Sequence, residues 1–598
     1  MDSQGDEVSA SGRADAGKLK GALLCALFPV VAVMAALPFV EMGINDDFSY
    51  TQIALRLAQT GKLAYNGWNT PMIGLQAYWA ALFIKLFGFS FALVRFSTLP
   101  FAAGCSVLLY LLALRAGLSR TLAVFLAFVL AFSPLAIPLE ASFMTDIPGQ
   151  FFTLLCVLCI LEATDTGATA AKIAAWAALL AVAGLAGGTM RQTNFLIPVF
   201  FLPYIAWRSS GWPIRIWCGV CALASVLGTV ELMHWFSHQL YVPVLPLLPL
   251  ANRAGYLRIA DNLLGLLMEL AVLLVPVTIL YLFIRVRLNR IVWLLLSAGS
   301  VLVAAAVILA MPYFHDIVFR LMGGNILTDT GILGTGVEVI GDKPRILPLW
   351  LQIVLVALGV GLAALAAVEL IRRRGDSAEN LRAALARWVR STSGRSRFEH
   401  ACLLFAIMYC PLVASRAIVM QGFDRYLLPL LALGGISLLA WLPARVPIKL
   451  TAAWAFALLF AVYGVATTHD YFACSRARLK AALMLADAHI PRRCVSAGLE
   501  YDGWTEIALH GYINRLEIAV PPNSYQSVAG RTYPITPPYW FWELTPTLEP
   551  AWLVVTSPQP GLTTLPQYEV SYHAWLPPFE RRVLVQAASD AAAVCGVK

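Results

Sequence analysis

Two adjacent carboxylates, Asp46 and Asp47, follow the first long apolar run of the chain, in the stretch Asn45-Asp46-Asp47-Phe48-Ser49-Tyr50. Ionisable groups beside a membrane are costly to place and usually functional. Neighbouring carboxylates there suit a general base, a metal site or a cationic partner. The alternative is a solvated loop start that caps a helix over residues 50–59. Position and residue type alone leave both interpretations open.

A second acidic pair, Glu140 and Asp146, precedes another apolar run. We expect this loop to lie on the same side of the membrane as Asp46. The order Thr145-Asp146-Ile147-Pro148 is also typical of a helix N-terminus, where the helix dipole and capping favour Asp. A helix end and a functional acid therefore remain equal interpretations here.

Two arginines close the set of candidate residues. Arg191-Gln192 ends one apolar run, and Asp424-Arg425-Tyr426 opens a later one. Arginine at the outer membrane interface clamps a phosphate with two parallel N–H groups, or extends along the lipid toward the headgroups. Carboxylates that activate an acceptor, together with cations that hold a phosphate, are the groups needed to transfer a sugar or similar group from a lipid phosphate.

Metal chemistry has little support in the sequence. The eleven cysteines form no CxxC pair, and no Cys/His spacing matches a zinc site. The metal ligands are therefore unknown, and a divalent cation is the only cofactor that the acidic residues leave open. We expect no nucleic-acid partner.

Helices in a membrane must position these residues. Of the 598 residues 59% are hydrophobic and 13% charged, about half the charged share of a soluble protein. Apolar runs of this length must form helices in lipid, because each backbone group needs an internal partner. The sequence predicts an all-α polytopic membrane protein of about thirteen spans: 21–40, 97–114, 119–134, 147–163, 172–189, 194–207, 214–233, 263–284, 291–311, 347–371, 399–414, 426–442 and 449–467.

The distribution of Lys and Arg orients these spans. If residues 1–20 are a cytoplasmic tail, the cytoplasmic loops carry most of the cations: Arg115, Arg120, Lys172, Arg208, Arg215, Arg285, Arg287, Arg290, the arginines of 372–397, Arg445 and Lys449. Counting Leu75–Phe87 as a span would invert every later loop. We therefore expect 41–96 to be a long outer loop with helices on the membrane face. The expected location is a bacterial inner membrane, with the candidate residues facing the periplasm.

The character of the chain changes after residue 467. Segments become short and rich in Pro, Tyr and Trp, which predicts a small α/β domain in the periplasm over 468–598, after a transmembrane domain over 21–467. Cys474, Cys494 and Cys595 lie in it. An oxidising periplasm would allow one disulfide, but three cysteines do not identify the pair.

These residues resemble a family, the GT-C membrane glycosyltransferases, in the branch of protein O-mannosyltransferases and the lipid A aminoarabinose transferase. The resemblance begins at Asp46-Asp47-Phe48-Ser49-Tyr50 and continues through Tyr78-Trp79 and Leu93-Val94-Arg95. Thr145-Asp146-Ile147-Pro148 resembles the second acidic motif, and Asp424-Arg425-Tyr426-Leu427-Leu428-Pro429 the late Arg-Tyr motif. The layout agrees over most of residues 20–445.

The resemblance implies a GT-C fold, and a transferase that moves a sugar from a polyprenyl-phosphate donor to a periplasmic glycan, lipid or protein. Asp46 would be the base, supported by Asp47, and Asp146 would order the acceptor. Arg191 and Arg425 would contact the lipid phosphate. Tyr50, Gln192 and Asp424 would contact substrate. The aminoarabinose transferases have an acidic-Lys-Pro triplet where this chain has Asn69-Thr70-Pro71, which argues against equating their substrates.

Two other functions use similar residues. A transporter or flippase of a polyprenyl-linked or other anionic lipid would also need arginines and acids, but the chain shows no convincing internal repeat, and its acids lie at the membrane surface. A non-catalytic partner in envelope polysaccharide synthesis would differ only in activity.

Overall fold

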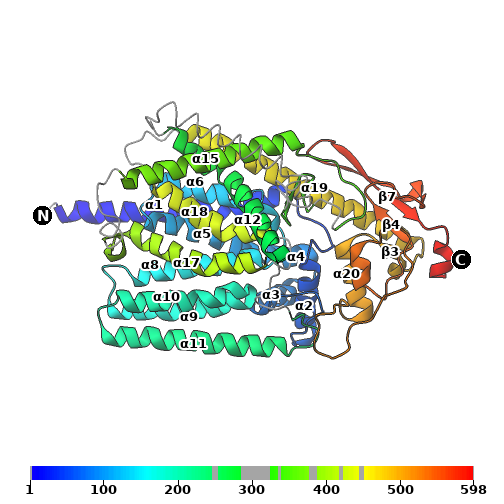
Figure 1. The fold of residues 1–598 in the computed structure, drawn as a ribbon, viewed down its shortest axis with the longest axis horizontal. Helices are drawn as coiled ribbons and strands as arrows, with labels where there is room; N and C mark the ends of the chain where they lie inside the picture. Colours follow the sequence, from blue (N-terminus) through cyan, green and yellow to red (C-terminus); the bar gives the residue numbers. More distant parts are fainter. Residues whose placement is uncertain are drawn as a thin grey trace.

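The computed structural model describes residues 3–244, 253–283, 324–333, 338–375, 387–416, 422–442 and 450–596. Figure 1 shows a bundle of helices running along the long axis, with the N-terminus at one end and the strands at the other. The long helices are α1 (Ser3–Ala35), α5 (Leu99–Arg115), α6 (Arg120–Ala131), α8 (Asp146–Ala163), α9 (Ala170–Met190), α10 (Leu196–Arg208), α11 (Trp212–Ser237), α12 (Arg253–Leu273), α15 (Leu349–Gly375), α17 (Gly394–Arg416), α18 (Leu428–Ala440) and α19 (Leu450–Asp487).

Within the described residues, eight helices are long and apolar enough to cross a membrane. A ninth candidate is the pair Asn262–Leu273 and Val275–Leu282, which meet at 54°, where Pro276 interrupts the helix. The chain is therefore a mostly helical, multi-pass integral membrane protein. The predicted spans 119–134, 194–207 and 426–442 correspond to the shorter helices α6, α10 and α18. The predicted span 291–311 lies outside the described residues.

Several predicted boundaries differ from the observed helix ends. Helix α1 begins at Ser3, inside the expected polar tail, and ends at Ala35 rather than at residue 40. Leu37 has φ +51 and Pro38 follows, so the helix cannot continue. The expected domain boundary after residue 467 lies inside α19, which continues to Asp487.

The expected outer loop 41–96 forms three short helices: α2 (Asp47–Thr60), α3 (Gly74–Phe87) and α4 (Phe91–Phe96). Tyr78, Leu82 and Leu86 recur along one side of α3 and are exposed. With only 14 residues, α3 is too short to span a membrane. An exposed apolar face on a short helix indicates that α3 lies against lipid.

The last hundred residues form a small mixed sheet beside the bundle. Its order is β3 (Val495–Ser496), β4 (Trp552–Val555), β7 (Glu580–Ala587) and β5 (Thr563–Thr564), and β6 (Val570–His573) pairs with β7. Strands β3 and β4 are parallel, and the other pairs are antiparallel. Helix α20 (Leu499–His510) follows β3 and ends at Gly511 with φ +92, a left-handed cap that suits glycine. We refer to residues 488–596 as the C-terminal segment.

Cys494 and Cys595 form a disulfide, which settles the pairing that the sequence left open, and Cys474 is a buried free thiol. The bond closes a loop across 101 residues. In the chain-entropy treatment, a loop of this length contributes about 4–5 kcal/mol. We therefore expect Cys494→Ser, or added reductant, to lower the unfolding temperature and to speed proteolysis of the C-terminal segment. Cys474→Ser is the control, and equal protease resistance with and without the bond would contradict the expectation.

Candidate active site

Asp46 lies just before α2, at the end of the bundle nearest the C-terminal segment. It is the residue before the first helical turn, yet its side chain makes no capping hydrogen bond. The Trp68 indole N–H instead donates to Asp46 Oδ1 at 2.9 Å, and Arg425 Nη1 lies 3.3 Å from Asp46 Oδ2. The Asp46 side chain therefore contacts Trp68 and Arg425 and does not cap α2.

Asp146 and Arg191 complete the group around Arg425. Arg191 Nη1 lies 2.7 Å from Asp146 Oδ1, and Arg425 Nη1 lies 4.0 Å from Asp146 Oδ2. The side chains of Arg191 and Arg425 are only 19% and 12% exposed. We call Asp46, Asp146, Arg191 and Arg425 the charged cluster. Four residues separated by up to 379 positions meet at one end of the bundle, as the sequence predicts.

Close packing of α8 and α9 places Arg191. The arginine is the first residue after α9, and the guanidinium lies 4.9 Å from the ring centre of Tyr426. A Cβ on Gly149 would come within 2.8 Å of the Arg191 Cβ, so only glycine allows this approach. Asn194 Nδ2 donates to the Gly149 carbonyl at 2.9 Å and holds the turn after α9 against α8.

Asp424 fixes the backbone that carries Arg425. Its carboxylate accepts hydrogen bonds from the N–H groups of Ile326, Leu327 and Arg425, at 2.7–2.9 Å for the shortest of each. Burial raises the pKa of Asp424 to about 6, although these hydrogen bonds favour the charged form. The sequence prediction gave Asp424 a substrate contact, but the side chain is fully buried and its oxygens face the backbone.

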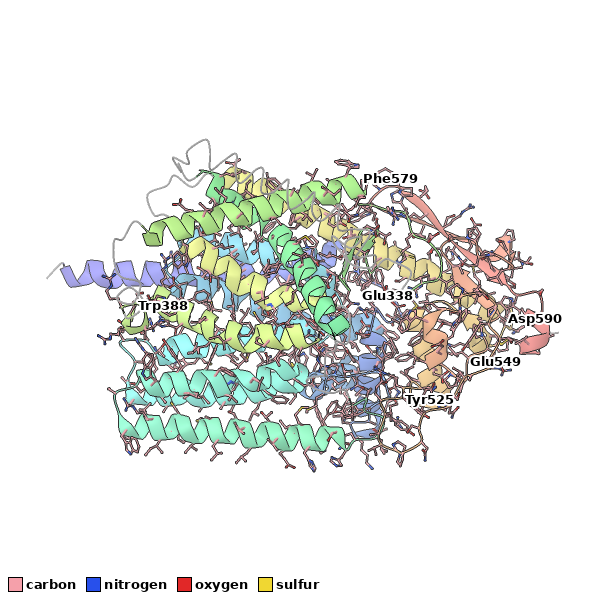
Figure 2. The ribbon with its side chains drawn as sticks, in the orientation of Figure 1. Glu338, Trp388, Tyr525, Glu549, Phe579 and Asp590 are labelled. Atoms are coloured by element: carbon pink, nitrogen blue, oxygen red, sulfur yellow. A yellow bond between two sulfur atoms is a disulfide. The ribbon has the colours of Figure 1, made fainter. Side chains whose placement is uncertain are left out.

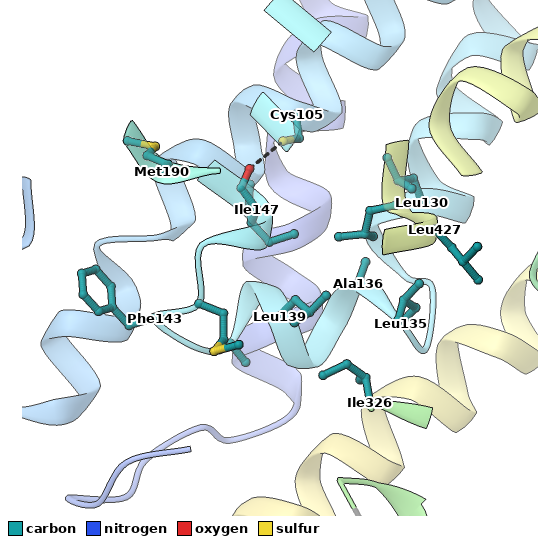
Figure 3. Close-up of a cluster of buried hydrophobic side chains, with 14 of the residues drawn as sticks. Cys105, Leu130, Leu135, Ala136, Leu139, Phe143, Ile147, Met190, Ile326 and Leu427 are labelled. Carbon is teal, nitrogen blue, oxygen red and sulfur yellow. Dashed lines mark hydrogen bonds between the residues drawn. The ribbon is translucent and has the colours of Figure 1, made fainter. Parts of the chain in front are cut away.

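An apolar cluster supports the charged residues from inside the bundle. Figure 3 shows Phe143, Ile147, Met190, Ile326 and Leu427, which all belong to one buried apolar cluster. Four of them, Phe143, Ile147, Met190 and Leu427, are within three positions of a member of the charged cluster in the sequence, and the Ile326 N–H donates to Asp424. In the same view Cys105 Sγ donates to the Ile147 carbonyl at 3.6 Å. Burial of these side chains fixes the chain segments from which the charged groups project.

Tyr50 is buried beside the charged cluster. Burial and the nearby charge of Asp46 raise its pKa well above the ordinary value, so the hydroxyl stays neutral and can donate a hydrogen bond. Burial alone would lower the pKa of Arg425, but Asp146 and Asp46 outweigh it and the pKa is raised. Arg425 Nε is buried and has no hydrogen-bond partner among the described residues.

Three other residues that the sequence analysis named as candidates, Gln192, Glu140 and Asp47, are not members of the charged cluster. Gln192 donates to the Thr70 carbonyl at 3.0 Å and so ties residues 69–71 to the turn after α9. Glu140 is buried, and burial raises the pKa of its carboxyl well above the ordinary value. Asp47 is completely buried behind Asp46 and accepts from the N–H groups of Ile44 at 2.5 Å and Phe143 at 3.3 Å.

Arg95, which sequence reasoning did not single out as functional, is the charged partner of Asp47. Arg95 Nε lies 3.4 Å from Asp47 Oδ2, and both side chains are at most 1% exposed. Its other N–H groups donate to the carbonyls of Val40 and Met42. Burial raises the pKa of Asp47 to about 6, against the opposing effect of Arg95. The Arg95–Asp47 pair therefore fixes the conformation of the loop before Asp46.

Breaking this pair should destabilise the protein. Arg95→Gln leaves a buried carboxylate without its counter-charge, which costs about 3–5 kcal/mol. We expect a clearly lower unfolding temperature in detergent. Arg582→Gln, which breaks an ion pair whose arginine is 65% exposed, should change it little. Equal effects of the two substitutions would show that the buried pair does not hold the loop.

Trp68 is the other contributor to the site that the sequence analysis did not identify. The C-terminal segment positions it. Ile513 N–H donates to the Asn66 carbonyl at 2.8 Å, and a Cβ on Gly67 would lie 2.4 Å from the Ile513 carbonyl oxygen. The Trp68 ring then packs against Phe541, with ring centres 5.4 Å apart. The first outer loop and the C-terminal segment thus build this side of the site together.

A cavity of about 220 Å³ lies between α19, residues 330–332 and 342–346, and strands β6 and β7. Its wall includes Lys343 and Arg581 with the rings of Tyr471 and Tyr572. The Asp470 carboxylate accepts from the N–H groups of Trp575 and Leu576 and pairs with Arg581 at 3.3 Å. Lys343 Nζ donates to the Leu333 carbonyl at 3.2 Å.

The described residues do not provide a metal site. No group of three or more His, Cys, Asp or Glu side chains among them could hold a metal ion. Asp46 and Asp146 already face arginine and tryptophan donors. This donor set does not fit a divalent cation, so no step below is assigned to one.

Solved structures with low similarity include three membrane transferases. The protein O-mannosyltransferase complex of S. cerevisiae bound to the sugar donor is 14% identical, with a TM-score of 0.29, 36% of this chain covered and 33% of that chain. ArnT from Cupriavidus metallidurans bound to undecaprenyl phosphate is 12% identical, with a TM-score of 0.39 and coverage of 95% and 98%. The oligosaccharyltransferase AglB from Archaeoglobus fulgidus, in complex with an inhibitory peptide and a dolichol-phosphate, is 14% identical, with a TM-score of 0.37 and coverage of 77% and 56%.

A comparison by sequence family is more informative. No curated protein matches the chain. Residues 70–235 match the sequence model of the dolichyl-phosphate-mannose-protein mannosyltransferase family. The matched range contains Asp146 and Arg191, and it confirms the resemblance seen in the motifs. Over residues 70–235, the chain is therefore similar to the dolichyl-phosphate-mannose-protein mannosyltransferase family.

Proposed function

We propose that the protein transfers a sugar from a polyprenyl-phosphate donor to an acceptor on the periplasmic face of a bacterial inner membrane. The observation that carries this proposal is the charged cluster, in which two carboxylates and two arginines meet at one end of the bundle. A site for this reaction needs a base for the acceptor hydroxyl and cations for the departing phosphate. We retain a GT-C fold of about thirteen spans for the whole chain.

The distribution of charge supports this orientation. At the opposite end of α8 from Asp146, Glu162 pairs with Arg115 at 2.5 Å and with Lys172 at 3.0 Å. Both cations belong to the loops that the positive-inside rule assigns to the cytoplasm. The charged cluster would then face the periplasm.

The proposed reaction is an inverting displacement. Asp46 takes the proton from the acceptor hydroxyl, whose oxygen attacks the anomeric carbon of the donor sugar. The bond from this carbon to the phosphate oxygen breaks, and its electron pair leaves with the lipid phosphate. Arg425 and Arg191 stabilise the charge on that phosphate, because buried arginines bind phosphate through two N–H groups at once. Asp146 keeps both guanidinium groups aligned.

The experiment that tests this function uses purified protein and a panel of radiolabelled polyprenyl-phosphate sugars with envelope extract as the acceptor source. We expect label to move from one donor to the extract, and the active donor names the sugar. The same assay with a chelator tests metal dependence. Binding of the lipid without transfer from any donor would contradict the enzyme assignment and favour a flippase.

We propose further that the sugar end of the acceptor occupies the cavity lined by Lys343 and Tyr471. The Tyr471 hydroxyl in its wall hydrogen-bonds Glu500, which in turn accepts from the Asn45 N–H, next to Asp46. Lys343 makes no ion pair with a carboxylate among the described residues and can hold an acidic group of the acceptor.

Replacing this lysine should therefore weaken acceptor binding. For Lys343→Gln we expect the amount of acceptor at half-maximal transfer to rise roughly tenfold, the value of one charge-assisted hydrogen bond. The KM for the donor should stay unchanged. The exposed Lys480→Gln is the control, and an unchanged acceptor requirement would place the acceptor elsewhere.

A further inference from the structure

The C-terminal segment reaches the backbone next to Asp46. Glu500 Oε1 accepts a hydrogen bond from the Asn45 N–H at 3.2 Å, across 455 positions in the sequence. Asn45 has φ +50, in the left-handed region that, after glycine, asparagine is among the residues most often found in. The residue before the proposed base is therefore held in an uncommon conformation by a carboxylate from α20.

Glu500 is itself fixed on two sides by α19. Arg478 Nη2 lies 2.8 Å from Glu500 Oε2, and the Tyr471 hydroxyl donates to Glu500 Oε1 at 2.5 Å. Glu500 is 0% exposed, and the Arg478 side chain is 1% exposed. Arg478 also donates to the Ala497 carbonyl at 2.8 Å through Nε. Arg478 and Tyr471 consequently fix the orientation in which the Glu500 carboxylate accepts from the Asn45 N–H.

Glycine at position 498 makes this arrangement possible. Gly498 has φ +96, and a Cβ there would lie 2.2 Å from the Glu338 carbonyl oxygen and 2.3 Å from Arg478 Nη2. Glu338 lies where the bundle meets the C-terminal segment (Figure 2). Three separate parts of the chain therefore converge around the guanidinium of Arg478.

No net gain in stability over apolar side chains is expected from such a network. Removing two charges from water costs several kcal/mol per ion, and a buried ion pair often contributes no more than apolar side chains of the same size. Beyond packing, the Arg478–Glu500 pair fixes the geometry of the neighbouring loop that contains Asn45. Small displacements matter there, since moving a reacting group by about 1 Å can cost 10²-fold in rate.

We propose that Glu500 is a positioning residue for Asp46. It holds the Asn45 N–H, and through that bond it sets the place of the Asp46 carboxylate between Trp68 and Arg425. This inference rests on the proposed function, in which Asp46 is the base. It makes the C-terminal segment a structural part of the active site and assigns Arg478 and Tyr471 the task of orienting Glu500.

The test compares Glu500→Gln with two matched variants. Gln keeps the size of the side chain but places an amide N–H₂ or a neutral oxygen against Arg478. Glu506→Gln is the buried control on the same helix, since Glu506 accepts from Thr547 and makes no hydrogen bond or ion pair with the described residues of the first outer loop. Glu549→Gln is the exposed control, from the pair with Arg493.

We expect Glu500→Gln to lower kcat at least tenfold while the KM for the donor changes less than twofold, because Arg191 and Arg425 remain in place. Hydrogen exchange of the peptide containing residues 40–50 should become faster in this variant and stay unchanged in Glu506→Gln. Tyr471→Phe keeps the ion pair between Arg478 and Glu500 and should give a smaller loss of kcat. It is the test variant if Glu500→Gln does not fold.

Two outcomes overturn the inference. One is wild-type kcat and exchange in Glu500→Gln. The other is an equal loss of kcat in Glu500→Gln and Glu506→Gln when both variants have their unfolding temperature lowered by the same amount. That result would mean that both substitutions act through stability alone. Failure of the proposed function is distinguishable, because the wild type would then show no transfer from any donor, whereas the exchange measurement reports the Asn45 contact without any activity.

Discussion

Asp46→Asn should lower kcat by about 10²- to 10⁴-fold, the usual contribution of a general base. The amide keeps the shape of the side chain and can still accept from the Trp68 indole at the position of Oδ1. It cannot take a proton from the acceptor. Because Arg425 loses the charge that faces it at 3.3 Å, binding of the anionic donor should be retained or become tighter.

The measurement is single-turnover transfer together with donor binding, for the wild type and the variant. Glu41→Gln is the matched control in the same outer segment, since Glu41 accepts from the Phe91 N–H at 2.8 Å and makes no ion pair with the described residues. Full transfer by Asp46→Asn would contradict the assignment of Asp46 as the general base. Loss of donor binding would instead mean that Asp46 organises the phosphate site.

Arg425→Gln should lower kcat/KM by about 10²- to 10³-fold, comparable to removing one donor that stabilises a developing negative charge. The arginine faces both carboxylates of the charged cluster and is only 12% exposed, so no water replaces it fully. The loss should appear in kcat as well as in KM, because the charge on the phosphate grows as the sugar leaves.

Arg425→Lys separates charge from geometry. A lysine keeps one positive charge but lacks the planar fork that binds phosphate through two N–H groups, so we expect an intermediate loss. Arg345→Gln, on a side chain that is 76% exposed, is the control and should transfer normally. If Arg425→Gln retains wild-type kcat/KM in steady-state assays over a range of donor concentrations, the phosphate is bound elsewhere.

The candidate site was predictable in its composition but only partly in its roles. Asp46, Asp146, Arg191 and Arg425 all adjoin apolar runs on one predicted side, and the structure brings them within 2.7–4.0 Å of a partner. Asp47 has the same residue type and nearly the same position as Asp46. It is nevertheless completely buried against Arg95. Adjacent residues of a helix start point in different directions, and sequence spacing alone does not show which one faces the site.

The apolar runs and the side on which Lys and Arg gather are properties of the sequence by itself. They determined a multi-pass helical protein, a non-spanning α3, and one end where acids and arginines collect, because burying backbone and charge in lipid leaves few alternatives. Tertiary structure alone decided which acid faces Arg425, which cysteines pair, that Trp68 reaches Asp46, and that Glu500 reaches the neighbouring Asn45. These contacts join positions up to 455 residues apart. They depend on how α8, α9, α19 and the C-terminal segment pack in three dimensions, which local residue patterns do not specify.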